Sequence, residues 1–164
     1  MTGSYRAHDA DETPVDGARI LVVAARFNAP IVALLREGAL AALSRLGAEA
    51  TVIEVPGALE IATAATLALD AAQAANAPYD GVVALGCVIR GETYHFELVA
   101  NESARALTDL SVSRRLPLGN GILTVDTKAQ ALERADPSRG DKGADAALAA
   151  LALVRLARGL RGGA

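Results

Sequence analysis

Residues 86–96 read Gly-Cys-Val-Ile-Arg-Gly-Glu-Thr-Tyr-His-Phe. The apolar run Gly81–Ile89 that leads into them predicts a strand buried on both faces. Arg90-Gly91-Glu92 predicts a tight turn, in which the glycine allows a close backbone approach. Thr93 suits the N-cap of a helix that begins at the next residue, which places His95 in the first helical turn. The stretch therefore predicts a strand, a turn and a helix in succession.

The predicted helix start combines an anion-binding environment with a candidate proton acceptor. Helix N-termini present unpaired N–H groups and the positive end of the helix dipole, which attract an anion. The same dipole disfavours a second positive charge, so we expect the His95 ring to be neutral near pH 7 and able to accept a proton. A lone histidine is more often structural, but its place after a glycine turn at a strand end favours a functional role. Arg90, in the same turn, either takes part in binding or only holds the loop.

The composition is that of a compact α/β protein. The chain has 164 residues, of which 52% are hydrophobic, enough for one domain with a substantial core. No apolar run approaches the ~20 residues of a membrane span, and the acidic N-terminus does not resemble a signal peptide. The single cysteine excludes an internal disulfide, which favours a cytoplasmic location. The net charge of −3 and the lack of a dense basic stripe argue against nucleic-acid binding.

The rest of the chain alternates between predicted strands and helices. Periodicity, capping residues and the positions of glycine and proline predict the other elements. Before the stretch described above, they predict a strand at Arg19–Ala25, a helix from Asn28 to Gly47, a strand at 50–55 and a helix at 58–75. The helix of that stretch ends near Leu110, and it is followed by a strand at 116–125, a short helix capped at Thr127 and a last helix at 142–160. This alternation predicts a three-layer αβα sandwich around a four-stranded parallel sheet.

We expect a single domain at residues 19–160. Residues 1–18 are acidic and lack periodicity, which predicts a flexible tail, and residues 161–164 are expected to fray. Ligands of parallel sheets bind at the carboxyl ends of the strands. Candidate functional residues are therefore those that directly follow the predicted strands.

Several side chains near these strand ends allow both a functional and a structural interpretation. The ring of Phe27 either stacks on a planar heterocycle or belongs to the core. Glu60 either binds a heterocycle N–H or complements a helix dipole. Arg134 and Lys142 either bind phosphate or are simply solvated. Cys87 lies inside a strand, which predicts a small packing residue whose backbone matters more than its thiol.

The chain resembles the 6,7-dimethyl-8-ribityllumazine synthase family. The motifs that carry the resemblance are Val55-Pro-Gly-Ala-Leu-Glu-Ile61, residues 86–96, Asn120-Gly-Ile-Leu-Thr124, Glu133-Arg-Ala135 and Asp141-Lys-Gly143. They occur in the family's order across about residues 19–160, and the stretch with His95 is the most specific of them. The resemblance implies a flavodoxin-like topology and a transferase acting in the penultimate step of riboflavin biosynthesis.

In that step 5-amino-6-(D-ribitylamino)uracil and 3,4-dihydroxy-2-butanone 4-phosphate would condense to 6,7-dimethyl-8-ribityllumazine, with release of phosphate and water. The resemblance implies no metal and no organic cofactor. It implies a homo-oligomer built from pentamers, with active sites between neighbouring subunits. The expected partners are thus small-molecule substrates and further copies of the chain, with no nucleic acid and no membrane.

Matching motifs assign roles to individual residues. Phe27 would stack on the pyrimidine, and His95 would shuttle protons. Asn120 stands where the family commonly has an aromatic, so it would replace apolar packing with a hydrogen bond to the substrate. A first group of residues would hold the pyrimidine and the ribityl chain, namely Ala58, Leu59, Glu60, Cys87, Val88 and Ile89. A second group would hold the phosphate, namely Glu92, Thr93, Lys142 and, from the adjacent subunit, Arg134.

Three alternatives use the same sheet. A non-catalytic riboflavin- or lumazine-binding paralogue would fit the same site, and Asn120 is the residue that favours it. A flavodoxin-like carrier would need a hydroxyl- and glycine-rich phosphate loop after the first strand, which residues 24–28 do not supply. A shell protein whose main task is assembly is compatible with catalysis.

Overall fold

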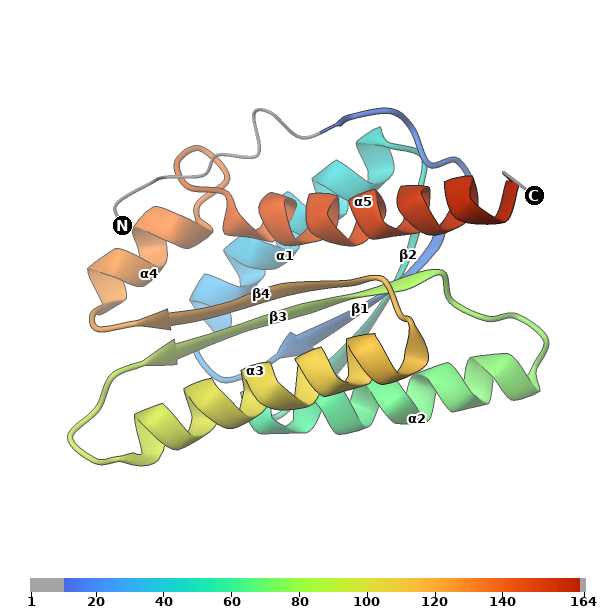
Figure 1. Cartoon of the computed structure of the whole chain (residues 1–164). Helices are drawn as coiled ribbons and strands as arrows, with labels where there is room; N and C mark the ends of the chain where they lie inside the picture. The colour runs from blue at the N-terminus through green and yellow to red at the C-terminus, as the bar shows by residue number, and fades with distance from the viewer. Residues whose placement is uncertain (1–10, 163–164) are drawn as a thin grey trace.

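The computed structural model describes residues 11–162 and shows a four-stranded parallel sheet between two layers of helices (Figure 1). The strands are β1 (Arg19–Ala25), β2 (Glu49–Val55), β3 (Gly81–Ile89) and β4 (Leu118–Val125), in the spatial order β2-β1-β3-β4. The central strands β1 and β3 are buried along almost their whole length, as continuous Val, Leu, Ile and Ala runs require. The predicted αβα sandwich is confirmed.

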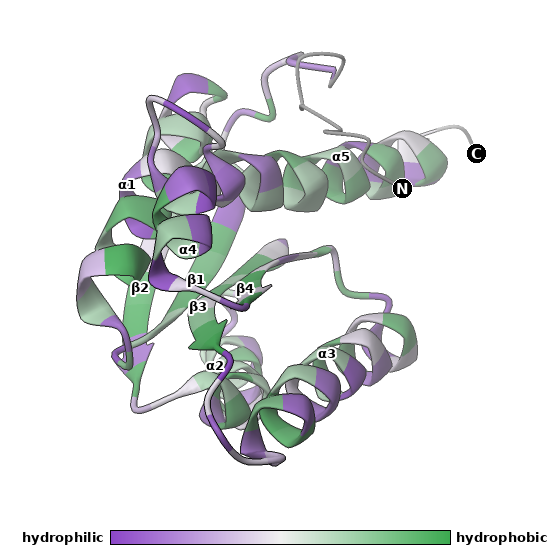
Figure 2. Cartoon of the chain, turned by 90° about the vertical axis from the view of Figure 1, so that its left-hand side faces the viewer, coloured by the Kyte–Doolittle hydropathy of each residue, from purple (hydrophilic) through white to green (hydrophobic). Residues whose placement is uncertain are grey.

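The helices cover the two faces of the sheet unequally. Helices α1 (Ala29–Arg45), α4 (Lys128–Ala135) and α5 (Lys142–Gly162) lie on one face, and α2 (Ile61–Ala74) and α3 (His95–Arg114) lie on the other (Figure 1). Each face has its own hydrophobic core. Figure 2 shows the hydrophobic residues gathered on the strands and the hydrophilic ones on the loops and outer helix turns.

Glycines let α5 approach its neighbours closely. A Cβ at Gly119 in β4 would lie 1.8 Å from the carbonyl oxygen of Ala146, and one at Gly143 would lie 1.9 Å from that of Leu35 in α1. No side chain fits at such distances, so α5 rests on both neighbours through backbone contacts. This close fit fixes the position of the start of α5.

Helix boundaries differ in several places from those that the sequence predicts. Asn28 occupies the N-cap of α1 with a left-handed backbone, φ 59°, but its side chain makes no cap hydrogen bond. The predicted helix at 58–75 is divided into a 3-10 turn at Ala58–Glu60 and α2. Helix α3 begins one residue later than expected and continues four residues beyond Leu110. The predicted capping box at Thr127 is confirmed by the hydrogen bond from Gln130 N to its Oγ1.

The segment before β1 is attached to the domain rather than free. Val15 is only 2% exposed, and its backbone N–H donates to the carbonyl oxygen of Leu46 over 2.8 Å. The guanidinium groups of Arg155 and Arg158 in α5 donate to the backbone carbonyls of Thr13 and Asp16. Residues 11–18 therefore pack against the domain, where the sequence predicts a tail. Residues 1–10 of the predicted tail and residues 163–164 of the predicted fray lie outside the described residues.

Candidate active site

The carboxyl ends of β1, β2 and β3 surround a pocket of about 480 Å³. The segment after β1 contributes Phe27 to its walls, and the segment after β2 contributes residues 56–60. The end of β3 and the residues that follow it contribute Cys87, Val88, Ile89, Gly91, Thr93, His95 and Phe96. The volume lies in the usual range for a small-molecule site. Parallel strands end at one edge of the sheet, so the topology alone brings the three segments together.

The segment after β1 presents an aromatic ring to this pocket. Phe27 is 71% exposed, so it is not the core residue that the sequence also allowed. Its backbone N–H donates to the carbonyl of Pro56, and the side-chain Nδ2 of Asn28 donates to the carbonyl of Cys87 over 2.9 Å. These bonds tie the segment to both neighbouring walls and leave the face of the ring free to stack on a ligand.

The segment after β2 adds a carboxylate whose orientation is fixed. Glu60 Oε2 accepts a hydrogen bond from the backbone N–H of Gly57 over 3.0 Å, while the rest of the side chain is exposed. Ala58 is buried and Leu59 is 42% exposed, so both help to form the apolar wall. One carboxylate oxygen thus holds the turn, and the residue still lines the pocket.

Strand β3 forms the floor of the pocket. The Cys87 side chain is buried, and burial raises the pKa of its thiol to about 11. The thiol is therefore protonated near neutral pH and has no role as a nucleophile there. Val88 and Ile89 are half-buried and line the pocket beside it. The predicted packing role of Cys87 fits this placement, and its carbonyl is engaged by Asn28.

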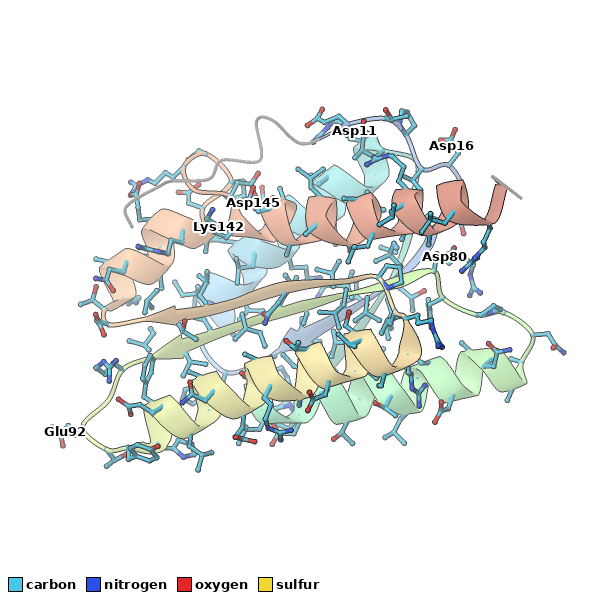
Figure 3. The ribbon with its side chains drawn as sticks, viewed as in Figure 1. Asp11, Asp16, Asp80, Glu92, Lys142 and Asp145 are labelled. Atoms are coloured by element: carbon cyan, nitrogen blue, oxygen red, sulfur yellow. The ribbon has the colours of Figure 1, made fainter. Side chains whose placement is uncertain are left out.

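The turn after β3 carries the histidine. His95 is the first residue of α3 and lies exposed at the pocket wall, next to Gly91, Thr93 and Phe96. The prediction that Thr93 is the N-cap was wrong, because Tyr94 occupies the N-cap of α3 and no side chain caps the helix there. Thr93 Oγ1 accepts only a long hydrogen bond of 3.4 Å from His95 N. Glu92 is not part of the pocket wall, and its side chain projects away from the domain (Figure 3).

Arg90 holds this turn, as the structural interpretation of the sequence predicts. Its guanidinium donates to Glu97 in α3 and, over 2.7 Å, to Asp126 after β4, and it stacks on the Phe96 ring 4.3 Å from the centroid. The hydrogen bond from Arg90 lowers the pKa of Glu97 below its ordinary value. Arg90 is thereby committed to protein groups and is absent from the pocket wall.

The other predicted ligand-binding residues line a separate pocket. Asn120, Arg134 and Lys142 come from β4, α4 and α5, and the pocket between them measures about 380 Å³. The Lys142 Nζ pairs with Asp145 over 2.7 Å, and Figure 3 shows this pair in the α5 layer, apart from Glu92. Asn120 Oδ1 accepts from the Ile122 N–H over 2.9 Å, which leaves its amide NH₂ to donate.

Sequence reasoning missed two residues that shape these pockets. Phe96 lines the first pocket beneath Arg90, and its position after His95 gave no separate signal. Asp145 lies three residues after Lys142 on a helix, a spacing that brings side chains together and could have indicated the pair. Within residues 11–162 no cluster of three or more His, Cys, Asp and Glu residues is arranged to hold a metal ion. In the same range no helix is both long and apolar enough to span a membrane.

Known proteins resemble this chain over almost its whole length. A family model described as 6,7-dimethyl-8-ribityllumazine synthase matches residues 17–158. The 6,7-dimethyl-8-ribityllumazine synthase 1 of Rhodopseudomonas palustris (strain ATCC BAA-98 / CGA009) is 56% identical over 160 residues, which cover 98% of each chain. The 6,7-dimethyl-8-ribityllumazine synthase of Methylocella silvestris is 64% identical over 142 residues, or 87% of each chain. That of Nitrobacter hamburgensis is 57% identical over 160 residues, or 98% of each chain.

Proposed function

The chain belongs to the 6,7-dimethyl-8-ribityllumazine synthase family, and from this premise we propose that its two strand-edge pockets are halves of one active site. The chain is a transferase of this type and acts in riboflavin biosynthesis. It condenses 5-amino-6-(D-ribitylamino)uracil with 3,4-dihydroxy-2-butanone 4-phosphate. The extent of the match favours this reaction over a non-catalytic flavin- or lumazine-binding role.

One observation carries the proposal about the two halves. The pocket that holds Phe27 and His95 has no lysine or arginine in its wall, although one substrate carries a phosphate group. The pocket beside β4 has two cationic side chains, Arg134 and Lys142, but no aromatic ring and no histidine. The two sets complement each other chemically. A neighbouring subunit that places its Arg134 pocket against the first pocket would supply the missing positive charge.

A head-to-tail contact repeated around a closed ring would bring the two pockets together at every interface. We infer a homo-oligomer built from pentamers, in which every interface completes one site. We also place the enzyme in the cytoplasm, because the single cysteine needs no oxidising compartment. No metal or organic cofactor enters the proposal.

Each half then has a defined task. In the first pocket Phe27 stacks on the pyrimidine, Glu60 binds a ring N–H, and the backbone of Cys87, Val88 and Ile89 lies along the ribityl chain. The N-terminus of α3, with Thr93 and the backbone at Glu92, receives the phosphate. The neighbour's Arg134 and Lys142 balance its charge. The NH₂ group of the neighbour's Asn120 donates to the heterocycle.

We propose a sequence of steps in which His95 moves the protons. The 5-amino group of the pyrimidine attacks the ketone, and loss of water gives an imine. His95 removes a proton from the carbon next to the imine as the phosphate leaves, and the resulting enol becomes a ketone. The ribitylamino nitrogen attacks that ketone, and loss of a second water closes the ring.

The rate enhancement has two sources of different size. Holding two substrates in place can lower a barrier by about 7–11 kcal/mol in favourable cases. A single general base typically contributes ~10²–10⁴-fold. Positioning therefore outweighs proton transfer, and the enzyme retains activity without its histidine.

The test mixes both substrates with the purified protein and follows lumazine formation together with phosphate release. We expect wild type to form both products in equal amounts, and His95→Ala to lower kcat by about 10²-fold or more while KM changes little. Arg134→Ala should instead raise KM for the phosphate substrate. Arg45→Ala, which removes an exposed arginine that lines neither pocket, is the control. A protein that binds lumazine but releases no phosphate would refute the catalytic role, and an unchanged kcat in His95→Ala would refute the role of His95.

A further inference from the structure

A different pocket lies at the opposite edge of the sheet, where the strands begin. It measures about 350 Å³ and is bounded by the segments before β3 and β4 and by the last turns of α2, α3 and α5. Asp80 in its wall is at the other end of the molecule from Glu92 (Figure 3). The pocket is thus separate from both halves of the active site, with which it shares no lining residue.

The wall of this pocket is strongly basic in a chain that is acidic as a whole. Four arginines line it, Arg114, Arg115, Arg158 and Arg161, against one carboxylate, that of Asp80. The net charge of the full chain is −3. Positive groups that converge on a concave surface focus the electrostatic field and concentrate anions there.

Two of the four arginines remain available to a ligand. Arg114 pairs with Asp70 over 2.7 Å, and Arg158 donates to the carbonyl of Asp16. The side chains of Arg115 and Arg161 have no hydrogen bond or ion pair with any other residue in the described range 11–162. The Asp80 carboxylate accepts a hydrogen bond from the backbone N–H of Arg19, so it is already engaged.

Complementing helix dipoles explains only part of this arrangement. Helices α2, α3 and α5 all end at this edge (Figure 1), and cations stabilise helix C-termini. An arginine can stabilise a helix C-terminus from any exposed position in the last turn, so this effect does not require arginines of different helices to line one cavity. Here arginines from two helices that are far apart in sequence face one hollow. Arg115 also follows the last residue of α3 and has a left-handed backbone conformation, φ 52°, so it does not continue the helix.

We propose that this pocket binds a small anion of phosphate type. The guanidinium group presents paired N–H donors that match phosphate oxygens, and two unpaired arginines supply up to two such contacts. The volume is at the lower end for ligand sites, which favours inorganic phosphate, pyrophosphate or a small phosphomonoester over a nucleotide. Because the site is remote from the catalytic pocket, its occupant does not compete with the substrates.

The experiment titrates the full-length enzyme with inorganic pyrophosphate by calorimetry at low ionic strength. We compare wild type, the double variant Arg115→Gln/Arg161→Gln, and Arg45→Gln, which removes an exposed arginine outside the pocket. Arg134→Ala identifies any binding in the catalytic site. We expect the double variant to lose the pyrophosphate site that Arg134→Ala retains, with affinity falling on the order of tenfold per arginine. Its lumazine-forming activity should match wild type, which also reports that it is folded.

The variant Asp80→Asn provides a second test, in which the pyrophosphate affinity is expected to rise and not to fall. The amide keeps an acceptor for the Arg19 N–H but removes the only carboxylate of the wall, so pyrophosphate affinity should rise. Raising the salt concentration should weaken binding in wild type and in this variant alike. If the double variant binds pyrophosphate as wild type does, or if Arg134→Ala abolishes all binding, the proposed site does not exist.

Discussion

At the scale of single residues, Cys87 links stability to pH. Burial raises the pKa of its thiol from 9.0 to about 11, so the folded state holds the proton more tightly than the unfolded chain does. Above pH 9 the unfolded chain releases this proton first, and the free energy of unfolding falls until the folded thiol also ionises near pH 11.

Cys87→Ala removes this contribution and should make the protein less sensitive to alkaline pH. Between pH 8 and 10.5 we expect wild type to lose about 1–2 kcal/mol more stability than the variant, since partial solvent screening reduces the full linkage effect. Urea unfolding at several pH values measures the difference in the free energy of unfolding between wild type and the variant. The other titrating groups are the same in both proteins, so their contributions cancel in this difference. A stability difference that stays constant with pH would contradict the burial of the thiol.

Individual side chains were the least predictable feature of the site. The strand pattern predicted that Cys87 packs in the sheet, because a continuous apolar run dictates burial. The pattern did not predict that Asn28 would donate to the Cys87 carbonyl instead of capping α1. Capping is a local preference, and a partner 59 residues away can outcompete it only once the sheet has formed. The exposure of the Phe27 ring likewise depends on neighbours that the local sequence does not identify.

At the scale of elements, Arg90 couples the turn before α3 to the turn after β4. It bonds Glu97 and Asp126 and covers the Phe96 ring, so three segments meet at one guanidinium. The Glu97 pKa is lowered by this contact, so the pairing is complete above the ordinary carboxyl pKa and is lost as pH falls through the lowered value. The turn that presents His95 is therefore held across the neutral range.

Arg90→Ala should loosen this turn without unfolding the domain. We expect faster amide hydrogen exchange at residues 91–96 and a lower kcat, because His95 is then less well positioned. Arg105→Ala is the matched control, since Arg105 also bonds two carboxylates but both belong to α3 itself. Equal exchange at residues 91–96 in the two variants would show that Arg90 does not hold the turn.

Element positions were predictable wherever a chemical signal marks the end. The observed limits of β1 and β3 match the predicted ones, because polar or glycine residues bound their apolar runs. The end of α3 was wrong by four residues. Its apolar periodicity fades after Leu110, but the helix continues until Arg115 adopts a left-handed conformation that usually falls to glycine or asparagine. The arginine at that position does not mark the stop, and the nearest signal is Pro117, two residues later.

At the scale of the whole molecule, the predicted site residues divide between two surfaces. His95 and Phe27 line the pocket at the ends of the first three strands, whereas Asn120, Arg134 and Lys142 line a pocket between β4, α4 and α5. Sequence order cannot reveal this division, because it does not show which face of the sheet the helices that carry Arg134 and Lys142 cover. The first pocket includes Val99 of α3 and the second includes Ala146 of α5, and these two helices cover opposite faces of the sheet (Figure 1).

If neighbouring subunits complete each site, two defective subunits should repair one another. We expect His95→Ala and Arg134→Ala proteins, dissociated and reassembled together in equal amounts, to recover activity well above either variant alone. In a head-to-tail ring with random mixing, about a quarter of the interfaces join an intact His95 pocket to an intact Arg134 pocket. Each variant reassembled alone controls for the procedure, and a size tag on one variant confirms that mixed rings form. Mixed rings without recovered lumazine formation would mean that each subunit carries a complete site, because only a shared interface lets the two intact halves meet.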